Sequence, residues 1–142
     1  MGRLTLPDQG AIYLDANCFI YSVEEIEPYR TLLEPVWRRG GIVTSDLTLL
    51  EVLVKPLQAA NVARQNTYRE LLAAPEVERL PLTTEVLEQA ARLRAATGIK
   101  TPDAIHAASA LLRNASLLLS NDKGFQKIPA LSFIYLRDLV SS

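Results

Sequence analysis

Short apolar runs alternate with segments of helical periodicity along almost the whole chain, and this alternation restricts the fold more than any other feature. The runs, which we interpret as five strands, are AIYL (11–14), GIVTS (41–45), VERLPL (77–82), SLLLS (116–120) and LSFIYL (131–136). Three of them are continuously apolar, which is typical of strands buried on both faces of a parallel sheet. Strands that alternate with helices predict one α/β domain of three layers, with the sheet between helices.

Helical segments separate these runs. We expect helices at 28–39, 46–54, 58–74, 83–98 and 101–114. Lys55-Pro56 should end the helix that begins at residue 46, because proline interrupts helical hydrogen bonding. Thr101 is a candidate N-cap, with Pro102 at the first helical position after it.

The segment 83–98 is the most regular of these helices. Gly98 stands where a C-terminal cap is expected. Its apolar residues fall on one stripe, formed by Val86, Leu87, Ala90, Leu93 and Ala96. The chain has no Gly/Ser linker, internal repeat or low-complexity tract, so we expect a single domain over residues 1–142.

Composition excludes several classes of protein. The 142 residues are 49% hydrophobic and 22% charged, which is usual for a globular protein. No apolar run approaches the roughly 18 residues of a membrane-spanning helix and no signal peptide is evident, so we expect a cytoplasmic protein without a membrane partner.

The single cysteine, Cys18, excludes an internal disulfide and a multi-cysteine zinc site. The net charge of -1 argues against a surface that binds nucleic acid everywhere, but it permits a local nucleic-acid site.

Four acidic residues stand out by their positions. Asp15 interrupts the apolar stretch IYLDANCFIY at the end of the first strand, and Asp122 follows the strand SLLLS. In an open parallel sheet, ligands bind beyond the carboxyl ends of the strands, where both side chains should lie. Asp103, in the first turn of its helix, can face the same edge. Glu51 lies in the apolar segment LTLLEVLV, where an unpaired carboxylate would be costly unless it is paired or binds a cation.

Each acid also has a simpler explanation. Asp15 can cap a helix that starts at Asn17, and Asp122 in NDKG is a natural turn residue. Asp103 complements a helix dipole, and Thr48–Glu51 matches a capping box. These explanations treat the acids one by one and do not account for the set. Four acids, three of them at element ends that could share one edge, favour a hard-cation site with oxygen ligands.

The motifs DANCFIY, TLLEVLVKP, KTPDAIHAA and SNDKGF, in this order, resemble those of PIN domains. The short chain is similar to the VapC-type toxins of prokaryotic toxin-antitoxin pairs, and the likeness runs from about Ile12 to Leu136. It implies a parallel five-stranded sheet between helices, Mg²⁺- or Mn²⁺-dependent cleavage of RNA, a small antitoxin protein as partner, and a homodimer. By resemblance, the four acidic positions of the family are taken by Asp15, Glu51, Asp103 and Asp122.

Two more positions follow from the resemblance, and the chemistry of the reaction gives the four acids their roles. Ser120 takes the small hydroxyl position of the family, and Asn17 takes the polar position two residues after the first acid. A divalent ion generates a nucleophile from water and stabilises charge on phosphoryl oxygens. Mg²⁺ prefers oxygen ligands and keeps several waters, so a few carboxylates can hold it while phosphate binds. The four acids are thus the candidate catalytic and metal-binding residues, and Glu51 is also a candidate for orienting the attacking water.

Residues beside these motifs favour simpler roles. His106, the only histidine, lies one helical turn after Asp103. We favour packing, or contact with a ligating side chain, over a role as ligand, because Mg²⁺ suits oxygen rather than imidazole. Lys100, Lys123 and Lys127 could contact RNA phosphates, although solvated surface charge is the simpler explanation.

Two alternative functions remain open. Haloacid-dehalogenase-like phosphohydrolases also have an aspartate at the end of the first strand, with a second aspartate two residues later, where this chain has Asn17. A catalytically silent protein-binding domain, whose acids only cap helices, would lack metal-dependent nuclease activity.

Overall fold

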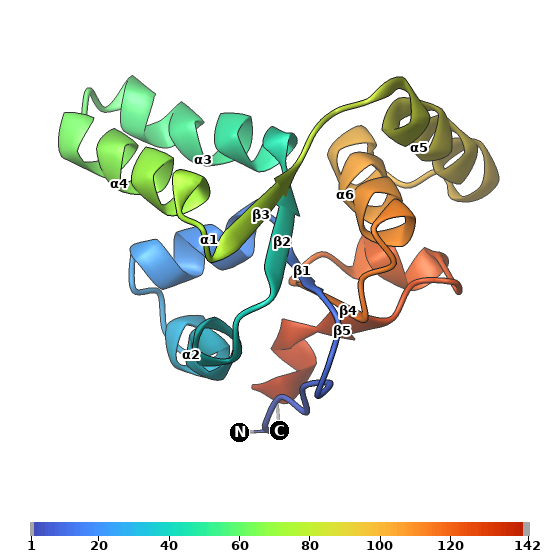
Figure 1. The fold of residues 1–142 in the computed structure, drawn as a ribbon, viewed down its shortest axis with the longest axis horizontal. Coiled ribbons are helices and arrows are strands. Elements are labelled where there is room, and N and C mark those ends of the chain that lie inside the picture. Colours follow the sequence, from blue (N-terminus) through green and yellow to red (C-terminus); the bar gives the residue numbers. More distant parts are fainter. Residues whose placement is uncertain (1, 141–142) are drawn as a thin grey trace.

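The structure, a computed structural model that describes residues 2–140, has a five-stranded sheet between two layers of helices (Figure 1). The strands are β1 (Ile12–Leu14), β2 (Ile42–Ser45), β3 (Val77–Leu80), β4 (Leu117–Ser120) and β5 (Phe133–Tyr135). All neighbouring strands pair in parallel, in the order β3-β2-β1-β4-β5. The predicted parallel sheet of five strands is confirmed.

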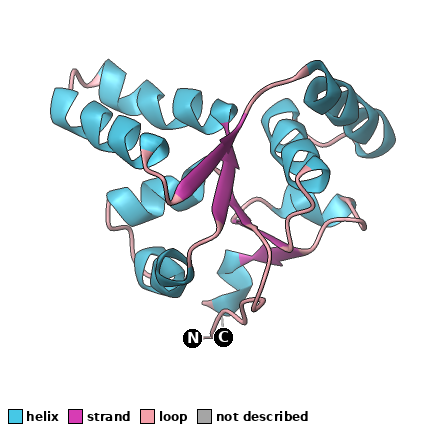
Figure 2. Cartoon of the chain, in the orientation of Figure 1, coloured by secondary structure: helices cyan, strands magenta, loops and turns pink. Residues whose placement is uncertain are grey.

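In the described part of the chain, six α-helices and two short 3-10 helices surround this sheet. They are α1 (Ala16–Val23), α2 (Tyr29–Arg39), α3 (Asp46–Gln58), α4 (Val62–Ala73), α5 (Thr84–Thr97), α6 (Thr101–Leu112), η1 (Lys123–Lys127) and η2 (Leu136–Leu139). Helices α1 to α4 lie on one side of the sheet, and α5 and α6 lie on the other (Figures 1 and 2). Within residues 2–140, none of the helices has the length and apolar character needed to cross a lipid bilayer.

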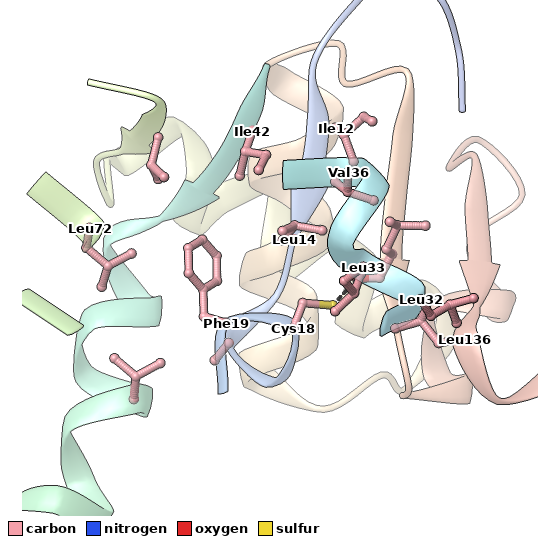
Figure 3. Close-up of a cluster of buried hydrophobic side chains, with 14 of the residues drawn as sticks. Ile12, Leu14, Cys18, Phe19, Leu32, Leu33, Val36, Ile42, Leu72 and Leu136 are labelled. Atoms are coloured by element: carbon pink, nitrogen blue, oxygen red, sulfur yellow. Dashed lines mark hydrogen bonds between the residues drawn. The ribbon is translucent and has the colours of Figure 1, made fainter. Parts of the chain in front are cut away.

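The burial of the strands explains their apolar character. Every residue of the three inner strands β1, β2 and β4 is buried, whereas the edge strands β3 and β5 are partly exposed. Successive side chains point to opposite faces, so Ile12 and Leu14 enter one core and Tyr13 enters the other. In the first core, Phe19 of α1 and Leu33 of α2 lie beside β1 (Figure 3).

Small side chains bring α6 close to the second face of the sheet. Four alanines of this helix are buried in the second core: Ala104, Ala107, Ala108 and Ala110. They share this core with Tyr13 of β1 and Val43 of β2. Because alanine adds little thickness, the first turn of α6 can approach the carboxyl ends of the strands, and this turn carries Asp103.

Two expected helix boundaries were wrong. Helix α3 continues through Pro56 to Gln58, although we expected it to end at residue 54. Pro56 is buried, and its carbonyl accepts hydrogen bonds from the Asn61 N–H and from the side chain of Gln65, so contacts with the next helix stabilise this turn. Helix α4 begins at Val62 instead of residue 58, because the Asn61 side chain caps it by accepting the Arg64 N–H.

Two local details of α5 and α6 also differ from expectation. Lys100, and not Thr101, occupies the N-cap position of α6, and no side chain caps this helix. On α5, Val86 and Ala90 are buried, but Leu87 is 48% exposed. Ala96, also on the expected stripe, is exposed. Helix α5 lies outside α6, away from the sheet (Figure 1), so only a narrow part of the stripe reaches the core. Gly98 ends α5 in the left-handed conformation, as expected.

Candidate metal centre

The carboxyl ends of β1 and β4 meet where the order of the sheet reverses. From β1 the chain proceeds outward through β2 to β3, and then crosses through α5 and α6 to β4 on the other side of β1. In open parallel sheets, ligands bind in the crevice at such a switch point. Asp15 immediately follows β1, Ser120 is the last residue of β4, and Asp122 is two residues further on. The topology therefore brings three of the expected side chains to one edge.

Ser120 links the two aspartates. Its hydroxyl donates to Asp15 Oδ2 at 2.5 Å and accepts the Asp122 N–H at 2.9 Å. The other oxygen, Asp15 Oδ1, accepts the Cys18 N–H at 3.3 Å. Burial raises the pKa of Asp15 above its ordinary value, although the nearby His106 and the hydrogen bond from Ser120 oppose this shift. Asp15 is thus a rigidly held carboxylate that is only 5% exposed.

Asp103 and Asp122 form a hydrogen-bonded carboxyl pair. The pKa of Asp103 is raised to about 8, mainly by burial and then by the adjacent Asp122, with smaller contributions from Asp15 and Glu51. The pKa of Asp122 is lowered, chiefly because it accepts the hydrogen bond from Asp103. The pair therefore shares one proton at neutral pH. All three other acids act electrostatically on Asp103, so the four acids form one cluster of negative charge.

Glu51 approaches this cluster from α3, which lies on the other side of the sheet from α6 (Figure 1). A pocket of about 490 Å³ is lined by all four acids, together with Asn17 and His106. Glu51 is on α3, its side chain is 28% exposed, and its Oε1 lies 2.6 Å from His106 Nε2. His106 is buried and makes a second hydrogen bond with Tyr13. The structure thus brings together every site residue expected from the sequence.

The simpler explanations for the acids prove compatible with a shared site. Asp15 is also the N-cap of α1, and Asp122 accepts the Gly124 N–H at 2.8 Å at the start of η1. The capping box was wrong, because Ser45 caps α3. Thr48 lies inside that helix and hydrogen bonds to Thr44. Each capping carboxylate uses only one oxygen for a backbone N–H; the other oxygen of Asp15 accepts the Ser120 hydroxyl, and Asp122 also hydrogen bonds to Asp103.

The donor set fits a hydrated Mg²⁺ or Mn²⁺ ion. Within residues 2–140, no three His, Cys, Asp or Glu side chains stand close enough together to ligate one ion in their present positions. Mg²⁺ commonly binds through only one or two carboxylates and keeps several waters. The Asp103–Asp122 pair, with Asp15 and Glu51 nearby, offers oxygen donors and negative charge to such an ion. Simultaneous ligation by all four acids stays a prediction.

Tyr13 is the residue that analysis of the sequence missed. It lies in the middle of β1, and its hydroxyl is 2.7 Å from His106 Nδ1. A signal was present, since a tyrosine in a fully buried strand must place its hydroxyl against a polar partner. Cys18 is buried and donates to the Leu119 carbonyl, in agreement with a packing role.

Comparison with known proteins identifies the family. The family model of the PIN domain matches residues 12–131. The chain belongs to the PIN domain family. This membership decides against the haloacid-dehalogenase alternative. No curated protein matches the chain significantly.

Solved structures of several other proteins share the fold. VapBC2 from Rickettsia felis, bound to a DNA fragment from its promoter, matches with a TM-score of 0.70 and 21% identity over 87% of this chain and 97% of that chain. A toxin-antitoxin complex from Klebsiella pneumoniae matches with a TM-score of 0.68 and 23% identity over 85% and 94%. VapBC-1 from nontypeable Haemophilus influenzae matches with a TM-score of 0.67 and 25% identity over 87% and 96%. The PIN fold of this chain is therefore similar to chains of VapBC assemblies.

The raised pKa of Asp103 predicts how the stability of the metal-free protein depends on pH. Its folded-state pKa of about 8 lies above the ordinary value of 3.8, so between these pH values the folded protein holds a proton that the unfolded chain has released. This contribution to stability is complete below about pH 4 and is lost as the pH rises through about 8. We expect the melting temperature in EDTA to fall from about pH 5 to about pH 9, and Asp103→Asn to flatten that slope. Equal slopes in both proteins would contradict the prediction. Asp122, with its lowered pKa, acts only at lower pH.

Metal binding should relieve the repulsion within the cluster and raise the melting temperature. A ligand at 100 times its Kd adds about 2.7 kcal/mol to the free energy of unfolding. For a domain of this size, each kcal/mol raises the melting temperature by about 2–4 °C. We expect Mg²⁺ to raise the melting temperature of the wild type and to have a smaller effect on Asp103→Asn, which should be at least as stable as the wild type in EDTA.

Asp103→Ala is the matched control for a purely helical role of this acid. Loss of an acidic group that complements the dipole at a helix N-terminus costs about 0.3–1 kcal/mol whether or not metal is present. If Mg²⁺ does not change the melting temperature of the wild type, while Asp103→Ala lowers the melting temperature both in EDTA and in Mg²⁺, then Asp103 only stabilises its helix and does not bind metal.

Proposed function

We propose that this PIN domain is a metal-dependent endoribonuclease and the toxin of a toxin-antitoxin pair. The observation that carries the proposal is the convergence of Asp15, Glu51, Asp103 and Asp122 on one pocket at the switch point of the sheet. Membership of the PIN family, whose members are nucleases, supports hydrolysis of phosphodiester bonds. The similarity to chains of VapBC assemblies supports the role of toxin.

The roles of the individual residues follow from their surroundings. A bound Mg²⁺ or Mn²⁺ would supply a water-derived nucleophile and stabilise charge on the phosphoryl group. Asp103 and Asp122 would hold the ion and lose their shared proton on binding it, while Ser120 keeps Asp15 in a fixed orientation beside them. Glu51, held by His106 on the opposite wall of the pocket, is placed to accept a hydrogen bond from the attacking water.

Polar and basic residues at the edge of the cluster would contact the RNA. Asn17 is exposed and lines the pocket, so its amide can donate to a phosphate oxygen. Lys100 and Lys127 are close enough to Asp122 to help lower its pKa. Lys123 lies over the ring of Tyr135. Three lysines beside the cluster would offset its negative charge toward a phosphate backbone.

The purified protein should cleave RNA only when Mg²⁺ or Mn²⁺ is present. Asp15→Asn should abolish cleavage, because it removes a charge from the cluster while the side-chain oxygen can still cap α1. The measurement is cleavage of single-stranded and structured RNA by wild type and variant, in EDTA and in each metal. Undiminished activity in EDTA, or persistent cleavage by Asp15→Asn, would overturn the assignment. A folded protein that binds metal without cleaving RNA would favour the silent binding domain.

The surface around the pocket supports a protein partner. Large apolar side chains are exposed on and beside α3: Ile26, Leu50, Val54, Leu57 and Val62. Ile26 and Val54 also line the acidic pocket. A segment that combines apolar side chains with a basic group would cover both features at once. We propose that a small co-encoded antitoxin does so and thereby blocks the site, because an unrestrained ribonuclease would harm its own cell. We further propose that the protein acts in the cytoplasm as a homodimer.

Substitution on this surface should release the partner. Val54→Lys places a charge on the apolar rim of the pocket, so we expect it to lose both copurification with the small protein encoded beside it and inhibition by that protein. Leu87→Lys is the matched control, because Leu87 is similarly exposed (48%, against 44% for Val54) but lies on α5, on the other side of the sheet. Equal loss in both variants would argue against this surface. A gene neighbourhood without a small partner, together with harmless expression of the active protein alone, would argue against the role of toxin.

A further inference from the structure

One buried side chain connects the three elements that carry most of the acidic cluster. His106 Nδ1 is 2.7 Å from the hydroxyl of Tyr13, and His106 Nε2 is 2.6 Å from Oε1 of Glu51. Tyr13 is two residues before Asp15 on β1, His106 is one turn after Asp103 on α6, and Glu51 is on α3. Tyr13 and His106 are 0% and 2% exposed, so solvent does not compete for the bond between them.

The chemistry of the partners determines the direction of the bonds. An ionised carboxylate can only accept hydrogen bonds, so His106 Nε2 must carry a proton and donate it to Glu51. The ordinary pKa of a tyrosine is about 10, so the phenol of Tyr13 is protonated at neutral pH. In the neutral imidazole, Tyr13 donates to Nδ1 and thereby selects the tautomer with its proton on Nε2. The donor to Glu51 is therefore set by a residue of the central strand.

Glu51 depends on this donor. Within residues 2–140, the imidazole of His106 is the only hydrogen-bonding partner of its carboxylate. A glutamate side chain that is 28% exposed keeps rotamer freedom unless a partner restricts it, and the hydrogen bond with His106 supplies that restriction. The hydrogen bond engages Oε1 and leaves Oε2 available to the pocket.

We propose that His106, oriented by Tyr13, is a positioning residue that holds the Glu51 carboxylate toward the metal centre. This inference rests on the proposed function and assigns a role to a residue that is itself no ligand. A packing role alone would require only that the buried nitrogens find partners; here one partner is a carboxylate of the pocket itself. In characterised metal sites, loss of such an outer partner typically weakens metal affinity or activity about 10–100-fold.

The tautomer can be measured without metal or substrate. Because the chain has a single histidine, imidazole ¹⁵N spectra contain one set of signals. We expect a proton on Nε2 in the metal-free wild type, and Tyr13→Phe, which keeps the buried ring, to shift the Nδ1 signal. A tautomer with its proton on Nδ1 alone would overturn the inference, because Glu51 would then have no donor.

Mn²⁺ affinity distinguishes positioning from packing. His106→Leu removes the donor at similar volume, whereas His106→Gln retains an N–H donor, and both are compared with the wild type by titration with Mn²⁺ alone. We expect His106→Leu to weaken Mn²⁺ binding about tenfold or more, and His106→Gln to recover most of the loss. Tyr13→Phe should give a smaller loss than His106→Leu, and it tests the inference even if His106→Leu does not fold.

A double-mutant cycle supplies the control. If His106 acts through Glu51, His106→Leu should have no further effect on Mn²⁺ affinity in a Glu51→Gln background. An equal effect in both backgrounds would overturn the inference, as would wild-type affinity in folded His106→Leu or Tyr13→Phe. Failure of the wild type to bind Mn²⁺ would instead overturn the metal centre itself.

Discussion

The mutual repulsion of carboxylates at one edge of the sheet is the constraint on which the rest of the site depends. Asp15, Glu51 and Asp122 come from different parts of the fold, yet each of them raises the pKa of Asp103. Without a cation, the site lowers this repulsion by sharing a proton within the Asp103–Asp122 pair. A divalent ion can replace that proton and supply more positive charge. The arrangement is therefore least favourable when empty and fully ionised, which is the condition in which affinity for a cation is highest.

Holding these charges together requires rigid support from the uncharged parts of the fold. The buried alanines of α6 let its first turn approach the sheet, and Ser120 bridges β4 to Asp15. On the far wall, the buried imidazole of His106 donates to Glu51. Asp15 and Glu51 are thus each held by a buried partner, which opposes rotation of these two side chains into solvent. The same rigidity would keep the geometry ready for an ion.

The fold and half of the site follow from local features of the sequence. Asp15 and Asp122 could be placed because each directly follows an apolar strand, and the carboxyl ends of parallel strands share an edge. The contact between Glu51 and His106 could not be derived, since it joins α3 to α6 across 55 residues and depends on helix packing. The end of α3 was missed for a similar reason, because contacts with α4 stabilise the turn at Pro56. Local sequence patterns thus predict the structure except where contacts between different helices determine where a side chain lies or where a helix ends.

Two of the acids serve the backbone and the pocket at once, and this explains why simple rules for capping gave a correct but incomplete account of them. Asp15 accepts the Cys18 N–H with one oxygen and the Ser120 hydroxyl with the other, and Asp122 accepts the Gly124 N–H. Serine or asparagine could cap these turns equally well without adding charge to a crowded pocket. At Asp15 the charged form is unfavourable in the fold alone, because burial raises the pKa of this carboxyl, and a bound cation would offset that cost. The choice of aspartate over neutral capping residues is the part of the sequence that folding alone does not explain.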